Sequence, residues 1–457
     1  MKIETLKSQL IFLFALLVYN SVCIADSGGT DHILENVYLG VSSCASSVCH
    51  GSTGRSESNV LQNEYRTWFK HDAHHKAYET LLSSDSKIIG SHLGIDAPER
   101  AKECLQCHST YVPEFQRGDK FRLDDGVGCE SCHGAAGNYI KSHTQKERSH
   151  EENKRDGLTD LANPKIRSEV CLSCHQGSGE QTVDHRLIGA GHPRLSFELD
   201  TYSINQPMHW QIDSDYLERK GGYQSGKFWA LGQVYRAKSM LSLMLSYSPK
   251  ISGTNKKADN IKNFKSGVLP ELSQYYCYNC HHSLKEEQWK NRQYGGHPGE
   301  LRLNISSLKI TSLVLLALGY NGIDKLESEI NDLHHAHLEG RDLELIKKII
   351  KTLETDAIPF LDNLSFNKEN TLKIFKEVTN YSVNTHFLPY EIAEQCAMAL
   401  SALSSQYKII TGSDFLSGEI KILYKSLRHE KDFKPEEFTK KAKDIEIALL
   451  KKEPALK

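Results

Sequence analysis

The chain has 457 residues, of which 25% are charged and 39% are hydrophobic. Lysine and arginine (56) nearly balance aspartate and glutamate (58), so the formal net charge is −2 at pH 7. These values exclude a long disordered chain and a polytopic membrane protein, and they give no electrostatic reason to expect nucleic-acid binding. The twelve cysteines and 22 histidines are the unusual part of the composition, and their positions need examination.

Residues 1–25 have the pattern of a secretory signal peptide. Two lysines near the start precede an apolar run at residues 10–18, and small residues lead up to Ala25. The apolar run is about half as long as the roughly 20 residues that span a bilayer. We predict cleavage near Ala25 and export to the periplasm, with an uncleaved anchor or cytosolic retention as the alternatives.

Ten of the twelve cysteines occur in pairs, and a histidine directly follows each pair. Four pairs have the form C-x-x-C-H, and the first pair is two residues wider. In chain order the motifs are Cys44/Cys49/His50, Cys104/Cys107/His108, Cys129/Cys132/His133, Cys171/Cys174/His175 and Cys277/Cys280/His281. The composition predicts only about 0.015 C-x-x-C-H matches by chance, so the pattern is a strong signal.

The C-x-x-C-H spacing is typical of covalent haem attachment. Two thiols on one turn of chain can form thioethers with the vinyl groups of one haem, and the next residue brings an imidazole to the iron. We predict about five covalent haems of the c type, with the motif histidines as proximal ligands. Zinc ribbons would leave the adjacent histidines unexplained, and redox dithiols are expected near a βαβ pattern, which the sequence does not show. For the wide first motif, a disulfide or an empty site remains the alternative.

Several stretches around these motifs are similar to a known family. They are Cys44 to Gly51, W-F-K-H-D-A-H-H-K-A-Y-E-T-L from Trp68, the motif at Cys104, G-V-G-C-E-S-C-H-G from Gly126, and a looser match at residues 189–194. Residues 40–200 resemble the cytochrome c-554 family, whose haem core is related to those of hydroxylamine oxidoreductase and pentahaem nitrite reductase. The resemblance implies electron transfer. The chain departs from it in the wide first motif, in a fifth motif and in residues 300–457.

A low-spin haem needs a second strong axial ligand, and histidine often supplies it. The resemblance and local placement favour His74, with His71 or His75 as substitutes on the same face of a helix. His143 follows a glycine-containing hinge and His192 lies in a glycine-rich turn, so we predict both as further distal ligands. The lesser candidates are His185, His209 and His297.

A cluster of three histidines near residue 335 stands apart from these candidates. It comprises His334, His335 and His337. We predict a solvated helix end there, with a metal site or a haem cap as the alternative, because no cysteine or carboxylate pair completes a metal site.

The chain is predicted to be mainly α: a multihaem core of short helices and long loops, followed by a C-terminal helical bundle. The predicted parts are the signal peptide 1–25, a cytochrome c-554-like domain 26–210 with four motifs, a region 211–300 with the fifth motif, and a helical domain 301–457. Exposed loops are expected at 146–156 and 248–267. The helices are predicted at 63–82, 228–245, 301–318, 343–353, 372–378, 389–403, 420–427 and 442–450. Cys396 lies in the sixth of these and is predicted to be a buried core thiol.

Two functions use the same haems. A carrier would have six-coordinate irons and would pass electrons between redox partner proteins, with a membrane-associated quinol or cytochrome as a further candidate partner. An enzyme would keep one iron open for a small nitrogen compound such as nitrite, nitric oxide or hydroxylamine, and the first and fifth motifs are the ones to suspect. We favour the carrier, with the enzyme and a docking or sensor protein as the alternatives.

Overall fold

The computed structural model describes residues 36–456, apart from 54–60, 180, 211–213, 215–217, 219–223, 248–270, 282–300, 339–341 and 386. The predicted signal peptide, His297 and the second predicted loop therefore lie outside the described residues. The described part consists of helices, turns and three isolated bridges, and it contains no strand, which confirms the mainly α class. None of the described helices is long and apolar enough to cross a membrane.

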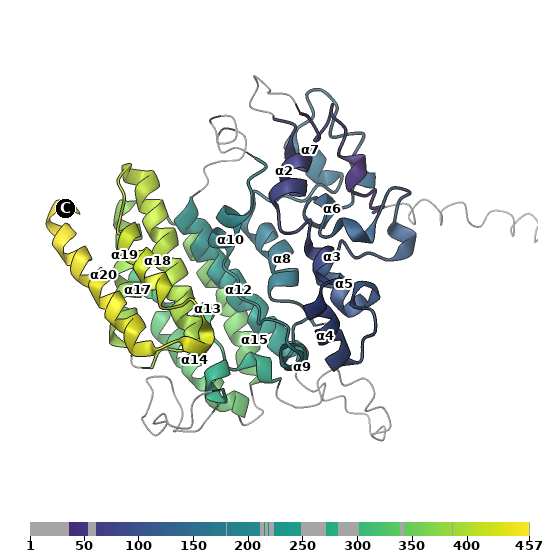
Figure 1. The fold of residues 1–457 in the computed structure, drawn as a ribbon. Coiled ribbons are helices and arrows are strands. Elements are labelled where there is room, and N and C mark those ends of the chain that lie inside the picture. Colours follow the sequence, from purple (N-terminus) through teal and green to yellow (C-terminus); the bar gives the residue numbers. More distant parts are fainter. Residues whose placement is uncertain are drawn as a thin grey trace, which may run out of the picture.

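The N-terminal half is built from short helices joined by turns (Figure 1). Its α-helices are α2 (Glu64–His71), α3 (Ala77–Thr80), α4 (Ser84–Leu93), α5 (Lys102–His108), α6 (Cys129–His133), α7 (His150–Arg155), α8 (Pro164–His175), α9 (His185–Ala190) and α10 (Leu199–Asn205). Glycines with positive φ follow α4, α6 and α9 directly, at Gly94, Gly134 and Gly191. Because L-residues rarely adopt this backbone conformation, glycine ends these helices early.

The predicted single helix over residues 63–82 is wrong, because the structure breaks it in two. α2 ends at His71, since Asp72 adopts an extended backbone with ψ 128°. The Asp72 carboxylate accepts a hydrogen bond from the His74 backbone N–H at 3.0 Å, which stabilises a turn before α3. His74 therefore lies in this turn and does not share a helix face with His71. The predicted loop at 146–156 is also wrong in part, because it contains α7.

The long helix α12 (Ser225–Tyr247) joins the two halves of the molecule. It packs against α8 and α10 on one side and against several C-terminal helices on the other. Trp229, Leu231 and Val234 are at most 1% exposed, so α12 is buried on nearly all sides. This explains why apolar residues occur on most sides of α12 rather than on one face.

The C-terminal half is a helical bundle, as predicted. Its helices are α13 (Ser306–Ala317), α14 (Ile323–Leu338), α15 (Leu343–Thr352), α16 (Ile358–Asn363), α17 (Lys368–Asn384), α18 (Tyr390–Thr411), α19 (Ser417–Lys425) and α20 (Pro435–Leu456). The sequence prediction missed α14 and α16. α14 carries a signal that could have been read, because Ile323, Leu326, Ile330 and Leu333 recur at helical spacing and are buried.

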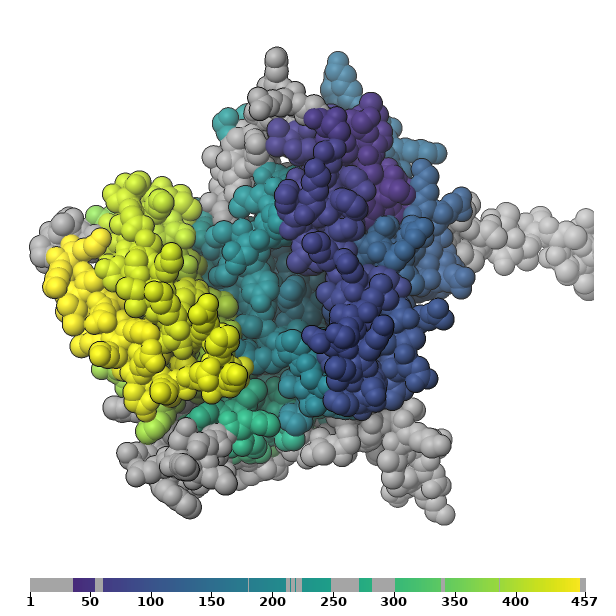
Figure 2. Space-filling model, in the orientation of Figure 1, coloured from purple at the N-terminus to yellow at the C-terminus, as the bar shows by residue number. Residues whose placement is uncertain are grey.

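One continuous apolar core fills the bundle and reaches α8 and α12. Cys396 lies within it and is fully buried, as predicted, and burial raises the pKa of this thiol to about 12. Polar contacts also join the halves: the Gln233 amide donates to Gln395 at 2.8 Å, and Arg194 pairs with Glu394 at 3.2 Å. In Figure 2 the purple and blue N-terminal segments and the yellow last helices lie on opposite sides of the molecule, and the teal segments lie between them.

Replacing Phe375 by alanine should lower the free energy of unfolding by about 3–5 kcal/mol, because this side chain is fully buried in α17 and leaves a cavity. Denaturant unfolding of the haem-loaded protein, followed by far-UV circular dichroism, would measure the loss. Leu450→Ala is the control, since Leu450 is 58% exposed and its loss should cost about 0.5 kcal/mol or less. Equal losses in both variants would contradict the assignment of the core.

Candidate haem-binding sites

Short helical turns carry four of the five cysteine motifs. Motifs 2, 3 and 4 lie at the ends of α5, α6 and α8, and motif 5 begins with the 3₁₀ turn η8 (Cys277–Asn279). On a helix, residues three apart lie on the same face, so both cysteines of a motif face the same way. The local fold therefore places both thiols of a motif on one side of the turn, where they can bond to the same planar group.

The wide first motif reaches a similar local arrangement by a different route. The Cys49 and Gly51 backbone N–H groups both donate to the Ser46 carbonyl, at 2.9 Å each. The His50 N–H donates to the Cys44 carbonyl at 3.1 Å. A tight turn thus absorbs the extra residues and returns Cys49 and His50 to Cys44. None of the described cysteines forms a disulfide.

Each motif histidine faces one other histidine across a gap. The ring centroids are 6.4 Å apart for His50 and His143, 6.1 Å for His175 and His74, 6.3 Å for His108 and His192, 6.3 Å for His133 and His209, and 6.3 Å for His281 and His185. A bond of about 2 Å from a metal to each imidazole, plus a ring radius of about 1 Å on each side, gives a centroid separation of about 6 Å. Each gap therefore has the width that one iron between two imidazoles requires.

Hydrogen bonds to Nδ1 orient several of these imidazoles. His50 Nδ1 lies 3.1 Å from Glu64, and His74 Nδ1 lies 2.9 Å from Asp72. Backbone carbonyls lie at 2.7–3.0 Å from Nδ1 of three other rings, those of His108, His143 and His192. A partner at Nδ1 fixes the tautomer and leaves Nε2 as the ligand atom, which is the usual arrangement of a metal-bound histidine.

Burial and charge adjust the protonation of these groups. Burial lowers the pKa of His133 and of His175 to about 4, with the neighbouring histidines adding to the effect. Both imidazoles are therefore neutral at pH 7, which is the form that binds a metal. Burial raises the pKa of Asp72, but hydrogen bonds from His74 and Gln206 outweigh it and hold that pKa at about 2.

The three histidines predicted as distal ligands, His74, His143 and His192, all face a motif histidine. His185 and His209, which the sequence ranked lower, do so as well. The substitutes His71 and His75 do not: His71 is exposed, and His75 packs against the Trp68 and Phe69 rings. His209 follows Pro207 and Met208 without any local pattern, so only the fold reveals its position.

The prediction of a solvated helix end at the three-histidine cluster is wrong for two of its members. His334 is 5% exposed, and burial lowers its pKa to about 4. His337 is mostly buried and its Nδ1 lies 2.5 Å from Asp342. His335 alone is exposed. Among the described residues no third metal-binding group closes around these rings.

Cysteine contacts show which motifs are neighbours. The Cys44 and Cys129 thiols are within hydrogen-bond range, and so are those of Cys107 and Cys174. The Gln181 amide lies between the latter two, 3.3 Å from one sulfur and 3.2 Å from the other. Motif 1 is therefore next to motif 3, and motif 2 is next to motif 4.

Two further contacts connect these neighbours. Cys171 contributes to the raised pKa of the Cys132 thiol, which requires the two residues to lie close together. Motif 3 is therefore also next to motif 4. Helix α9 begins at His185, which faces motif 5, and His192 follows its end and faces motif 2. The motifs thus follow one another in space in the order 1, 3, 4, 2 and 5.

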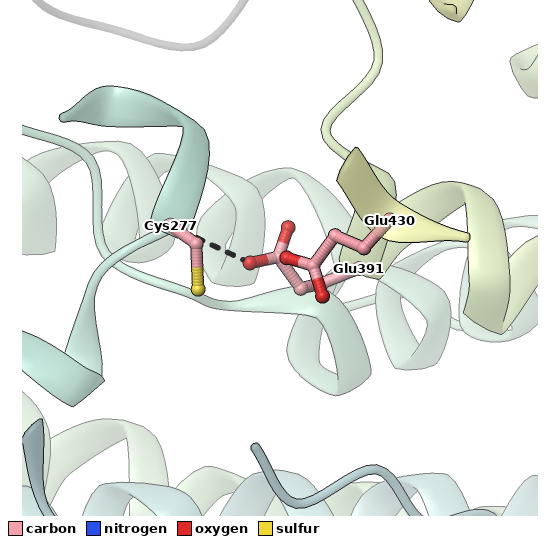
Figure 3. A group of neighbouring side chains, drawn as sticks. All are labelled: Cys277, Glu391 and Glu430. Carbon is pink, nitrogen blue, oxygen red and sulfur yellow. Dashed lines mark hydrogen bonds between the residues drawn. The ribbon is translucent and has the colours of Figure 1, made fainter. Parts of the chain in front are cut away.

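The fifth motif also contacts the helical bundle (Figure 3). The Cys277 N–H donates to the Glu391 carboxylate of α18 at 3.1 Å. The Cys277 sulfur and carboxylate oxygens of Glu391 and Glu430 lie within 4.8 Å of one another. We call these three residues and Arg194 the acidic cluster. Its sulfur belongs to a motif cysteine, so a thioether there would remove it as a ligand for a separate metal ion.

Cysteine pairs followed by histidine on helical turns, each facing a second imidazole, define the class of c-type cytochromes, whose covalently bound haem c serves electron transfer with redox partner proteins. Residues 43–134 match the family described as cytochrome c554 and c-prime, which confirms the resemblance predicted from the motifs. A relative is cytochrome c-554 of Nitrosomonas europaea, 27% identical over 135 residues. The match covers 27% of this chain and 56% of that relative. No solved structure shows significant similarity to the chain.

Proposed function

We propose that this protein is an exported electron carrier with five covalent haems, each held between two histidines. The observation that carries the proposal is the spacing of 6.1–6.4 Å between the imidazoles of all five pairs. When bound, haem c supplies reversible one-electron chemistry at iron. The chain supplies the thiols, both axial imidazoles and the hydrogen bonds that orient them.

The motif histidines are the proximal ligands in this proposal, because each directly follows its cysteine pair. The distal ligands are His143 for motif 1, His192 for motif 2, His209 for motif 3, His74 for motif 4 and His185 for motif 5. The alternative, an enzyme acting on a small nitrogen compound, needs an iron with an open position. The second imidazole at every motif argues against it.

The contacts between motifs support a row of haems rather than five separate centres. Thiols of adjacent motifs meet at Cys44 and Cys129 and again at Cys107 and Cys174. Thioethers at these positions would bring the edges of neighbouring haems close together. The role of the chain is then to hold a path through which electrons pass from one protein partner to another.

The proposed location is the periplasm, which the signal-like residues 1–25 support and which suits covalent haem attachment. The proposed partners are redox proteins, with a membrane-associated quinol or cytochrome as a further candidate. The related cytochrome of Nitrosomonas europaea covers too little of this chain to identify a partner for it.

The direct test is electron paramagnetic resonance of the oxidised, haem-loaded protein, with haem counted as the pyridine haemochrome. We expect five haems per chain, all low-spin, because each iron has two imidazole ligands. The Cys44→Ala/Cys49→Ala variant should retain four. A high-spin signal that changes on adding nitrite or nitric oxide would favour the enzyme, and four haems in the unaltered protein would exclude motif 1 as an attachment site.

His143→Ala should convert one haem in five to a high-spin form, because His143 is the proposed distal ligand at motif 1. His150→Ala is the matched control from the same segment, since His150 faces Asp160 at 3.4 Å and no motif histidine. The control should keep the low-spin spectrum of the unaltered protein. A fully low-spin His143→Ala spectrum would remove His143 from the ligand set.

Asp72→Asn should raise the reduction potential of one haem by tens of millivolts, roughly, because the carboxylate increases the basicity of the His74 ring that it orients. Spectropotentiometry of the loaded protein measures the shift. Glu79→Gln on α3 serves as the control, because it removes a carboxylate nearby without a hydrogen bond to His74. Identical titration curves for Asp72→Asn and the unaltered protein would contradict the proposed role.

A further inference from the structure

The fifth motif differs from the other four in its position. Helix α9 connects it to the row, because this helix carries His185 at its start and is tied to motif 2 by the ion pair of Arg186 with Glu103. The Glu271 carboxylate accepts a hydrogen bond from the His185 N–H at 2.8 Å. The other side of the fifth motif faces the bundle. A haem held here would form one end of the row.

The bundle places several carboxylates at this end, and burial raises the pKa of one of them, Glu391. Arg194 pairs with Glu430 at 2.6 Å and with Glu394 at 3.2 Å, and it lies 5.0 Å from the centre of the Tyr390 ring. One guanidinium thus forms ion pairs with two carboxylates. A third carboxylate, that of Glu391, is only 3% exposed and accepts the hydrogen bond from the Cys277 N–H.

The Cys277 sulfur lies within 4.8 Å of carboxylate oxygens of Glu391 and Glu430. Burial raises the pKa of this thiol to about 12, and Glu391 and Glu430 add to the rise. The field of these carboxylates would favour the ferric state over the ferrous state of an attached haem, because the ferric state carries one more positive charge.

We propose that the C-terminal helical bundle lowers the reduction potential of the fifth haem through the acidic cluster. The inference rests on the proposed function, since it requires a haem at Cys277 and Cys280. It gives residues 301–457 a role within the electron path, because the bundle would adjust the potential of the haem at one end of the row.

Charge changes at Glu430 test the proposal. Glu430 is partly exposed and begins the short 3₁₀ turn η10 (Glu430–Asp432) of the bundle. Glu430→Gln should shift the redox equilibrium of the fifth haem about threefold toward the reduced state, and Glu430→Lys about tenfold, whereas Glu430→Asp should stay near the unaltered protein. A tenfold shift corresponds to about 59 mV for a one-electron couple.

The Cys277→Ala/Cys280→Ala variant identifies the signal of the fifth haem. Its spectropotentiometric titration should lack the redox transition of that haem. Glu369→Gln is the matched control, because it neutralises a glutamate of the same bundle that pairs with Lys373 instead. The shifts should shrink at high ionic strength, since salt screens a partly exposed charge.

An unchanged reduction potential of the fifth haem in all Glu430 variants, or a shift of equal size in Glu369→Gln, would overturn the inference. Five low-spin haems in the same samples would leave the electron-carrier proposal intact. Loss of the low-spin spectrum, or an unchanged titration on removal of Cys277 and Cys280, would instead count against the proposed function itself. The Glu430→Asp variant separates the two effects of the residue, because it keeps the charge and alters only the packing.

Discussion

The architecture of the N-terminal half depends on holding pairs of imidazoles at a fixed distance. Two neutral rings separated by about 6 Å have no attraction strong enough to set that gap, so the backbone around them must do so. The Asp72 carboxylate, the Glu64 carboxylate and several carbonyls orient the rings, and glycines end the short helices where the chain must turn. Apolar burial has a smaller part here than in the bundle, where nearly every helix contributes fully buried side chains.

The sequence reveals the cysteine motifs more clearly than the distal histidines that face them. A cysteine motif is local, so the spacing of Cys104, Cys107 and His108 is sufficient to predict what these residues do. A distal histidine is not local, because a distant segment of the chain must bring it to its motif. His74 could be inferred from the family resemblance, whereas His209 has no pattern in its surroundings and becomes a candidate only through the fold.

Helix prediction shows the same division. Where apolar residues recur at helical spacing, as in α12, the sequence predicts the helix to within three residues at each end, whereas α18 begins as predicted but continues eight residues further. The break at Asp72 was missed because residues 63–82 contain good helix formers on both sides. One side-chain hydrogen bond to the backbone outweighs this propensity. The buried histidines of α14 were misjudged for a related reason, since a polar residue at a helix end is exposed in most proteins.

The five imidazole pairs also bear on how the chain reaches its fold. Each pair joins residues that are far apart in the sequence, and in four of the five pairs the segment between them contains cysteines of other motifs. A bound iron would therefore act as a long-range cross-link, closing a loop whose closure is entropically costly for a free chain. Several of these loops overlap, so closing one of them constrains the others. Cofactor attachment and folding of the N-terminal half would then be a single cooperative process, while the bundle has an apolar core of its own.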